Sequence, residues 1–164
     1  MNQKAQFFGK YRGTVSDNLD PNGLGRIKAT VRDVFGDQES GWAMPCAPYA
    51  GNGVGFFMIP PKGAGVWIEF EHGDPNYPIW TGCYWARGEV PASPALPDKK
   101  VIKTQTATLT LDDTAGASGV TIETTSGLKI VMNTSGIQIT DGQGAKIELS
   151  GPKVSVNDSA LEVT

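Results

Sequence analysis

SGLKIVMNTSGIQITDGQGAKIELSG, residues 126–151, alternates apolar and polar side chains and is interrupted by glycine at 127, 136, 144 and 151. Alternation with a period of two is typical of β-strands, because successive side chains point to opposite faces of a sheet. Each segment between glycines contributes only two or three apolar side chains. Strands with so few apolar side chains cannot build a normal core within one layer. We therefore expect neighbouring strands or other chains to cover their apolar side.

The same pattern extends over residues 104–164 as seven segments whose spacing is irregular but close to eight residues. Repeats of this size become stable by stacking on neighbouring units or on other chains. We therefore expect that this tail cannot fold alone. Alternation assigns these side chains to the inward face: Leu109, Leu111, Val120, Ile122, Leu128, Ile130, Met132, Ile137, Ile139, Ile147, Leu149, Val154, Val156, Leu161 and Val163.

Composition divides the chain into two halves. All Phe, Tyr and Trp residues lie within residues 7–85. Residues 1–88 carry eight basic and eight acidic side chains, and residues 89–164 carry six basic and nine acidic ones, which places the net charge of -3 on the tail. The proline-rich stretch RGEVPASPALPDKK between them favours an extended connector. We predict a barrel domain over 1–88, a linker over 89–103 and a needle domain over 104–164.

The first half reads as short strands broken by glycine and proline, without an amphipathic helix of ordinary length. We place strands near 9–16, 25–34, 41–48, 65–71 and 78–85. Five strands in so short a span predict a small closed barrel of the OB type, because closure removes exposed edges. The segment YAGNGVGFFMIPPKGAG, residues 49–65, is the longest stretch without a predicted strand.

Charge and cysteine content exclude several classes of protein. An acidic tail argues against binding nucleic acid, since affinity for phosphates comes from Lys and Arg. Cys46 and Cys83 are the only cysteines, and one pair without a secretory signal fits synthesis in a reduced cytoplasm. No apolar run approaches the roughly 18 residues that suggest a membrane span. We expect a protein that is synthesised in the cytoplasm in soluble form.

Two glycine- and proline-containing turns stand out in the first half. In one, Asp20 and Pro21 precede Asn-Gly, and in the other Gly73, Asp74 and Pro75 join two strongly apolar strands. Glycine tolerates positive φ, aspartate bonds the local backbone and proline fixes its own φ. We interpret both as structural turns rather than catalytic motifs.

These turns lie in two motifs, GTVSDNLDPNGLGRIKATV at 13–31 and PKGAGVWIEFEHGDPNYPIWTG at 61–82. Together they resemble the OB domain of phage baseplate assembly protein V and of the valine-glycine repeat spikes of type VI secretion and other contractile injection systems. MPCAPYAG between them is similar to the family's third strand. The matching residues are Asp20, Pro21, Gly25, Arg26, Ile27, Val31, Gly65, Val66, Phe70, Gly73, Asp74, Pro75, Pro78 and Gly82.

The resemblance implies an all-β homotrimer, in which an N-terminal OB barrel is followed by an intertwined triple-stranded β-helix. It implies a structural central spike that joins a baseplate hub protein to the tip and pierces the target envelope. The target membrane would be touched only transiently, within an assembled phage or injection particle. Such a protein is not an enzyme and needs no cofactor.

The C-terminus of the chain is the expected docking site for a PAAR-type tip protein. Leu161, Val163 and Thr164 end the tail on an apolar pair with open strand edges. Some phage spikes close their tip with an iron held by histidines, but His72 is the only histidine here and lies in the barrel half. The resemblance therefore implies an apex without a metal.

Other readings remain open. The barrel could be a binding module for polysaccharide or single-stranded nucleic acid with a trimerising stalk, because Trp67, Trp80, Tyr84 and Trp85 could form a stacking platform. Core and interface packing is the commoner use of such residues. Glu71 and Asp74 could act as an acid and base pair, although a strand end and a turn explain them better. His72 has no accompanying metal ligands in the sequence.

Overall fold

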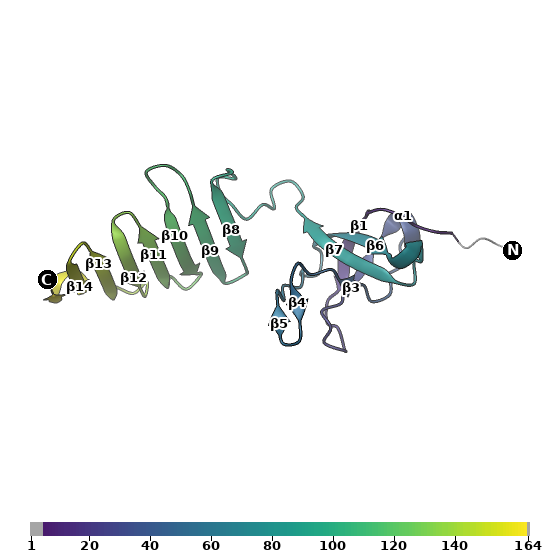
Figure 1. Ribbon diagram of the computed structural model, residues 1–164, viewed down its shortest axis with the longest axis horizontal. Coiled ribbons are helices and arrows are strands. Elements are labelled where there is room, and N and C mark those ends of the chain that lie inside the picture. The colour runs from purple at the N-terminus through teal and green to yellow at the C-terminus, as the bar shows by residue number, and fades with distance from the viewer. Residues whose placement is uncertain (1–4, 164) are drawn as a thin grey trace. The chain divides into compact units, whose positions relative to one another are not determined.

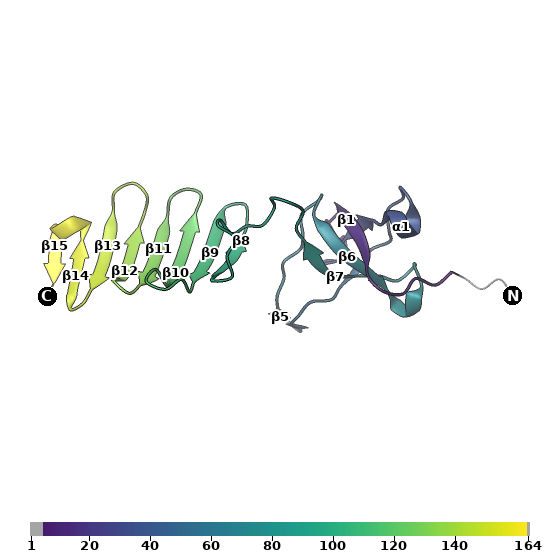
Figure 2. The same cartoon turned by 90° about the horizontal axis from the view of Figure 1, so that it is seen from above.

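The structure, a computed structural model, describes residues 5–163, with side chains throughout that range except at 159, 162 and 163. It divides into two compact units, Met1–Glu89 and Val90–Thr164. Strands dominate both units (Figures 1 and 2). The all-β class predicted from the sequence is confirmed. No helix in the described range is long and apolar enough to cross a membrane.

A five-stranded sheet forms the first unit, in the order β2-β1-β6-β7-β3. Its strands are β1 (Tyr11–Asp17), β2 (Lys28–Thr30), β3 (Met44–Pro45), β6 (Gly65–Phe70) and β7 (Pro78–Tyr84). All neighbours pair antiparallel except β3, which runs parallel to β7. A short 3-10 turn, η1 (Glu71–Gly73), joins β6 to β7.

Two backbone bridges close this sheet into a barrel. Ile27 and Ala43 exchange both hydrogen bonds, with N to O distances of 3.2 and 2.7 Å. A second bridge joins Thr30 to Glu39. Because these bridges link the chain beside β2 to the chain leading into β3, the two edges of the sheet are paired rather than open.

The barrel has a complete apolar core. Alternate residues of β6 point inward, so that Val66, Ile68 and Phe70 are buried while Trp67 and Glu69 face outward. Rings of Phe7, Tyr11, Phe35 and Phe70 pack edge to face or tilted, with centroids 5.7 to 6.1 Å apart. The buried apolar residues are Val15, Ile27, Ala29, Val31, Ala43, Val66, Ile68, Phe70 and Trp80.

Two predicted strands are shorter than the sequence suggested. The strand expected over 25–34 ends at Thr30, and α1 (Arg32–Phe35) follows as one helical turn, with the Phe35 N–H bonded to the Val31 carbonyl at 2.8 Å. The end of the expected strand is thus a helical turn that packs Val34 and Phe35 against the core. The strand expected over 41–48 reduces to β3, because Pro45 and Pro48 have no N–H to donate.

The segment expected to be a loop, residues 49–65, contains a small hairpin. Its strands are β4 (Ala50–Gly51) and β5 (Val54–Gly55), which pair antiparallel. The Phe56 N–H donates to the Tyr49 carbonyl at 2.9 Å and closes the base of the hairpin. Two-residue strands lie below the length at which alternation is readable in a sequence.

The second unit is one eight-stranded antiparallel meander, in which each strand pairs with its neighbours along the chain (Figures 1 and 2). The unit also contains the 3-10 turn η2 (Asn157–Ser159). In chain order the strands are β8 (Lys99–Lys103), β9 (Ala107–Asp112), β10 (Gly119–Thr124), β11 (Lys129–Asn133), β12 (Gly136–Thr140), β13 (Lys146–Ser150), β14 (Lys153–Val156) and β15 (Leu161–Val163).

The linker predicted over 89–103 is too long, because residues 99–103 form β8 and pair with β9. Three lysines within five residues, Lys99, Lys100 and Lys103, obscured the apolar pair Val101 and Ile102. The connector therefore runs from Val90 to Asp98, and the tail has eight strands where the sequence indicated seven segments.

Gly136 permits close packing between β12 and β13. It has a φ of +138°, and a Cβ there would lie 1.9 Å from the Leu149 carbonyl oxygen. Any side chain would push the two strands apart, so glycine is required here for pairing as well as for the bend.

An ion pair fixes the first turn motif on the barrel. The Arg26 guanidinium donates to the Asp20 carboxylate at 2.6 and 3.1 Å, and the N–H groups of Asn22, Leu24 and Arg26 donate to the same carboxylate. Only 4% of the Asp20 side chain is exposed. The Arg26 hydrogen bonds are the main cause that holds the pKa of Asp20 far below its ordinary value.

We predict that Asp20→Asn lowers barrel stability at neutral pH and removes part of its acid sensitivity. Because the folded-state pKa is depressed, the stabilisation is present above the ordinary value of 3.8 and is lost as the pH falls below it. All Trp residues lie in the barrel, so Trp fluorescence melts between pH 7 and 2.5 measure this unit alone. Asp37→Asn is the control, since Asp37 is 96% exposed. Parallel wild-type and Asp20→Asn curves would contradict the prediction.

Candidate functional site

The most unusual surface of the molecule is one face of the tail sheet. In an antiparallel pair, residues directly opposite each other lie on the same face, and the register aligns apolar residues into two columns across the strands. The first column is Ile102, Leu109, Ile122, Ile130, Ile139, Ile147, Val156 and Leu161. The second is Leu111, Val120, Met132, Ile137, Leu149, Val154 and Val163.

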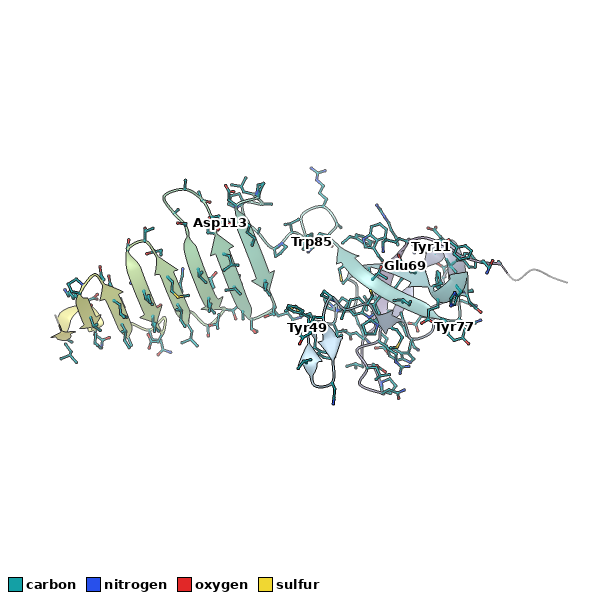
Figure 3. The ribbon with its side chains drawn as sticks, viewed as in Figure 1. Tyr11, Tyr49, Glu69, Tyr77, Trp85 and Asp113 are labelled. Atoms are coloured by element: carbon teal, nitrogen blue, oxygen red, sulfur yellow. The ribbon has the colours of Figure 1, made fainter. Side chains whose placement is uncertain are left out.

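This apolar face, defined as the two columns together, is open in the single chain. Ile102 is 50% exposed, Ile122 44% and Ile147 42%. Soluble monomers rarely leave large contiguous apolar patches in water, and such patches mark interaction sites. The side chains of this unit stand out from both sides of its strands in Figure 3, and the described residues of the tail form one sheet without a second layer over them. This geometry is typical of a surface that another chain covers.

Nearly all residues assigned to the inward face by alternation lie in these columns. Leu128 differs, because it precedes β11 and pairs with no residue of either column. Its backbone pairs instead with Thr124, whose N–H donates to the Leu128 carbonyl at 2.9 Å. Ile102 was missed by the sequence reasoning, although its place opposite Leu109 continues the first column. The adjacent apolar residues Val101 and Ile102 between lysines were the signal that could have found this strand.

The opposite face of the tail sheet is mainly polar, although the register also places Val101 and Val131 on it. Threonines and ion pairs occupy it, with Lys129 and Glu123 joined across β10 and β11 at 3.7 Å. Lys146 bonds both Asp158 and Glu148, and these hydrogen bonds, that of Asp158 above all, raise the pKa of Lys146. This arrangement suits a face in contact with water, so the two faces of the sheet have opposite requirements.

The C-terminal edge of the sheet is β15. Its Leu161 side chain is 60% exposed at the end of the first column. The backbone of Val163 pairs with Val154, while the Val163 side chain and all of Thr164 lie outside the described residues. β15 pairs only with β14, so one edge has no partner strand within the described chain.

In the barrel, the second turn motif has a structural arrangement. Asp74 accepts hydrogen bonds from the Asn76 backbone and side chain at 3.0 and 2.8 Å, and the Tyr77 N–H bonds the Asp74 carbonyl at 3.0 Å. Gly73 has a φ of +75° and is buried, and its carbonyl accepts a hydrogen bond from the Phe7 N–H at 2.8 Å, while Pro75 is half-buried. His72, also at positive φ, is exposed. Among described residues no group of three or more His, Cys, Asp or Glu is placed to hold a metal.

The four aromatic residues considered as a stacking platform do not form one. Trp80 lies in the core and donates from Nε1 to the Gly25 carbonyl at 3.2 Å. Trp67 and Tyr84 pack on the outer surface with centroids 5.1 Å apart, and the Arg12 guanidinium lies 5.5 Å from both rings. Trp85 is 64% exposed. Their separation into core and surface weakens the nucleic-acid or sugar interpretation.

Comparison with known families matches both units. Residues 11–85 match the type VI secretion system and phage-baseplate injector OB domain. Residues 99–162 match the phage baseplate V C-terminal trimerisation domain. The second match begins at the first residue of β8 and covers the strands that carry the apolar face.

A curated relative is similar over part of the chain. It is the type VI secretion system spike protein VgrG4b of Pseudomonas aeruginosa, 39% identical over 97 residues. The match covers 56% of this chain and 12% of the relative, so the chain spans a small part of that protein's length.

We predict that Ile130→Asp prevents assembly, because Ile130 lies in the middle of the first column between Ile122 and Ile139. A carboxylate buried there without a partner costs at least about 2 kcal/mol per chain. Lys129→Ala and Thr121→Asp, both on the polar face, should leave the mass of the assembly unchanged in light scattering. Equal effects on the two faces would show that the apolar face is not the interface.

Proposed function

This chain belongs to the baseplate V and VgrG-like spike family of contractile injection systems, and from that premise we propose that it is a homotrimeric central spike protein. The observation that carries the proposal is the open apolar face on the unit that matches a trimerisation domain. Three such faces turned toward a common axis would form the dry interior that each chain lacks. The three tails would then form the intertwined β-helix, with their polar faces outward.

The proposed role is mechanical and not enzymatic. The barrels would attach to a baseplate hub protein and the tails would project as a needle that pierces the target envelope. Contraction of a surrounding sheath would supply the work. Dense backbone hydrogen bonding and an interlocked apolar interior would let the needle carry load without unfolding. The protein would be made in the cytoplasm and act in an assembled particle, touching the target membrane only during injection.

The rival function is a binding module, in which the barrel recognises polysaccharide or single-stranded nucleic acid and the tail serves as a stalk. A basic groove would favour it, but the barrel half has equal numbers of basic and acidic residues. The dispersed aromatic residues give it no platform. The spike function is therefore the better supported of the two.

The direct test is the solution mass of the full chain by light scattering. We expect three times the chain mass of 17.4 kDa at every concentration down to the low micromolar range. A monomer would overturn both the proposed needle and its mechanism.

We predict that ending the chain at Glu89 leaves a soluble barrel that no longer forms a stable trimer. The reason is that the barrel has its own core while the tail has only the apolar face. Sedimentation of the shortened and full chains at matched concentrations measures this. A shortened chain that remains a trimer at low concentration would assign assembly to the barrel instead.

The free edge of β15, at the C-terminal end of the tail sheet, is the proposed docking site for a small PAAR-type tip protein.

We predict that ending the chain after Val156, which removes η2 and β15, abolishes binding of a PAAR-type protein from the same source. Leu161→Lys should weaken binding while keeping β15, because it replaces the exposed apolar side chain. Binding by pull-down that survives both changes would exclude the apex. Absence of binding to the full chain would favour a needle that closes itself.

A further inference from the structure

A second apolar surface lies on the barrel and has no role in the function proposed above. It comprises Leu24 beside the first turn and five residues of the β4–β5 hairpin and the segments that flank it. Each of these side chains is more than half exposed, and Phe57 is 76% exposed. We call it the hairpin patch, and its members are Leu24, Tyr49, Val54, Phe56, Phe57 and Met58. Tyr49 is labelled beside the hairpin in Figure 3.

The hairpin patch surrounds a hollow. Leu24, Tyr49, Phe57 and the edge of Trp80 are among the residues that line a space of about 490 Å³. Its floor is formed where Gly25 meets Ile59 and the Phe57 ring, which would lie 3.1 and 3.3 Å from a Cβ at that glycine. The patch is therefore a shaped surface with room for apolar side chains of a partner.

The sequence of this region carries no charge. Residues 42–61, WAMPCAPYAGNGVGFFMIPP, contain no Asp, Glu, Lys, Arg or His, although charged residues make up 19% of the chain. The cores of protein interfaces are depleted of charge, and permanent interfaces are more apolar than transient ones. A partner that is always present fits this composition better than one met only occasionally.

The short connector between the barrel and the tail indicates that this partner is another copy of the same chain. Only Val90–Asp98 separate the barrel unit from the first tail strand, and nine residues extend to roughly 30 Å at most. Three chains joined through their tails hold their barrels within a short tether of one axis, which gives an effective concentration on the order of millimolar. The other two copies are thus present at each hairpin patch from the moment of assembly.

Threefold symmetry explains why the patch is uncharged. Residues on a rotation axis face their own copies, so an ionised side chain there would meet two identical charges. Apolar side chains can meet in threes without that cost. We propose that the hairpin patches of the three barrels converge on the trimer axis and pack against one another, with Phe57 at the contact. This inference rests on the proposed homotrimer and adds a second, barrel-to-barrel interface to it.

Cross-linking of the full chain tests the inference. Cys46 and Cys83 are exposed and are first replaced by serine. Phe57→Cys is then compared with Tyr77→Cys, which is 60% exposed in the turn before β7 and labelled in Figure 3. With a short bismaleimide we expect at least five times more covalent dimer from Phe57→Cys, at a yield independent of protein concentration. Equal yields from the two positions would overturn the inference.

Light scattering on the same samples separates the two proposals. A monomer would refute the proposed homotrimer itself. A trimer that gives no preferential cross-link at position 57 would refute only the barrel-to-barrel contact, and would mean that the hairpin patch serves another protein.

A charge substitution gives an independent measurement. Phe57→Lys places three like charges at the proposed contact, so amides of residues 50–58 should exchange hydrogen at least tenfold faster than in the unmodified trimer. Tyr77→Lys is the matched control and should leave that exchange unchanged. Because Phe57 is largely exposed within its own chain, the barrel core should tolerate the change, which Trp fluorescence verifies. Unchanged exchange in a trimeric Phe57→Lys protein would overturn the inference.

Discussion

The apolar face of the tail sheet has no partner within its own unit, and this constraint governs the organisation of the chain. All of the buried apolar residues in the described range belong to the barrel. The described strands of the tail between β8 and β15 are paired on both sides but form one layer, so most of their backbone groups are satisfied while the apolar side chains remain open. A single sheet of this kind gains little free energy from burial until something covers it.

The barrel meets the opposite condition. Its edges are closed by the Ile27–Ala43 bridge, its apolar core is buried, and the Asp20–Arg26 ion pair holds the loop before β2. A unit that is already stable can present surfaces without depending on them for folding. The hairpin patch is one such surface, since its residues contribute little to the core of their own chain.

Local pairing suits the mechanical role proposed for the tail. Each strand of the meander pairs with strands adjacent in sequence, which keeps loop closure short and favours rapid pairing once an apolar surface is available. The first column places Ile130 between Ile122 and Ile139, so a substitution at Ile130 alters the side-chain packing of both neighbours on the same face. Gly136 shows how tightly the strands approach, since even a methyl group would overlap the Leu149 carbonyl.

Much of this was determined by the sequence alone. Alternation around Ile130 and Ile139 identified both the strands and the side that is apolar, because a period of two has a single structural meaning. The turn motifs at Asp20 and Gly73 located the barrel strands through local backbone preferences. These features depend on residues close together in the chain, where propensity and pattern act directly.

The tertiary structure decided what depends on distant residues. β2 ends at Thr30 and the chain turns into α1, which packs Val34 and Phe35 on the barrel core, and no local pattern distinguished this from a longer strand. β8 forms because it pairs with β9, which places Ile102 opposite Leu109 although lysines surround Ile102 in the sequence. The pairing of Arg26 with Asp20 and the exposure of Phe57 beside Gly25 likewise require the chain to be folded. Sequence fixes which side chains alternate, whereas burial is a property of the space around them and is set only when remote segments meet.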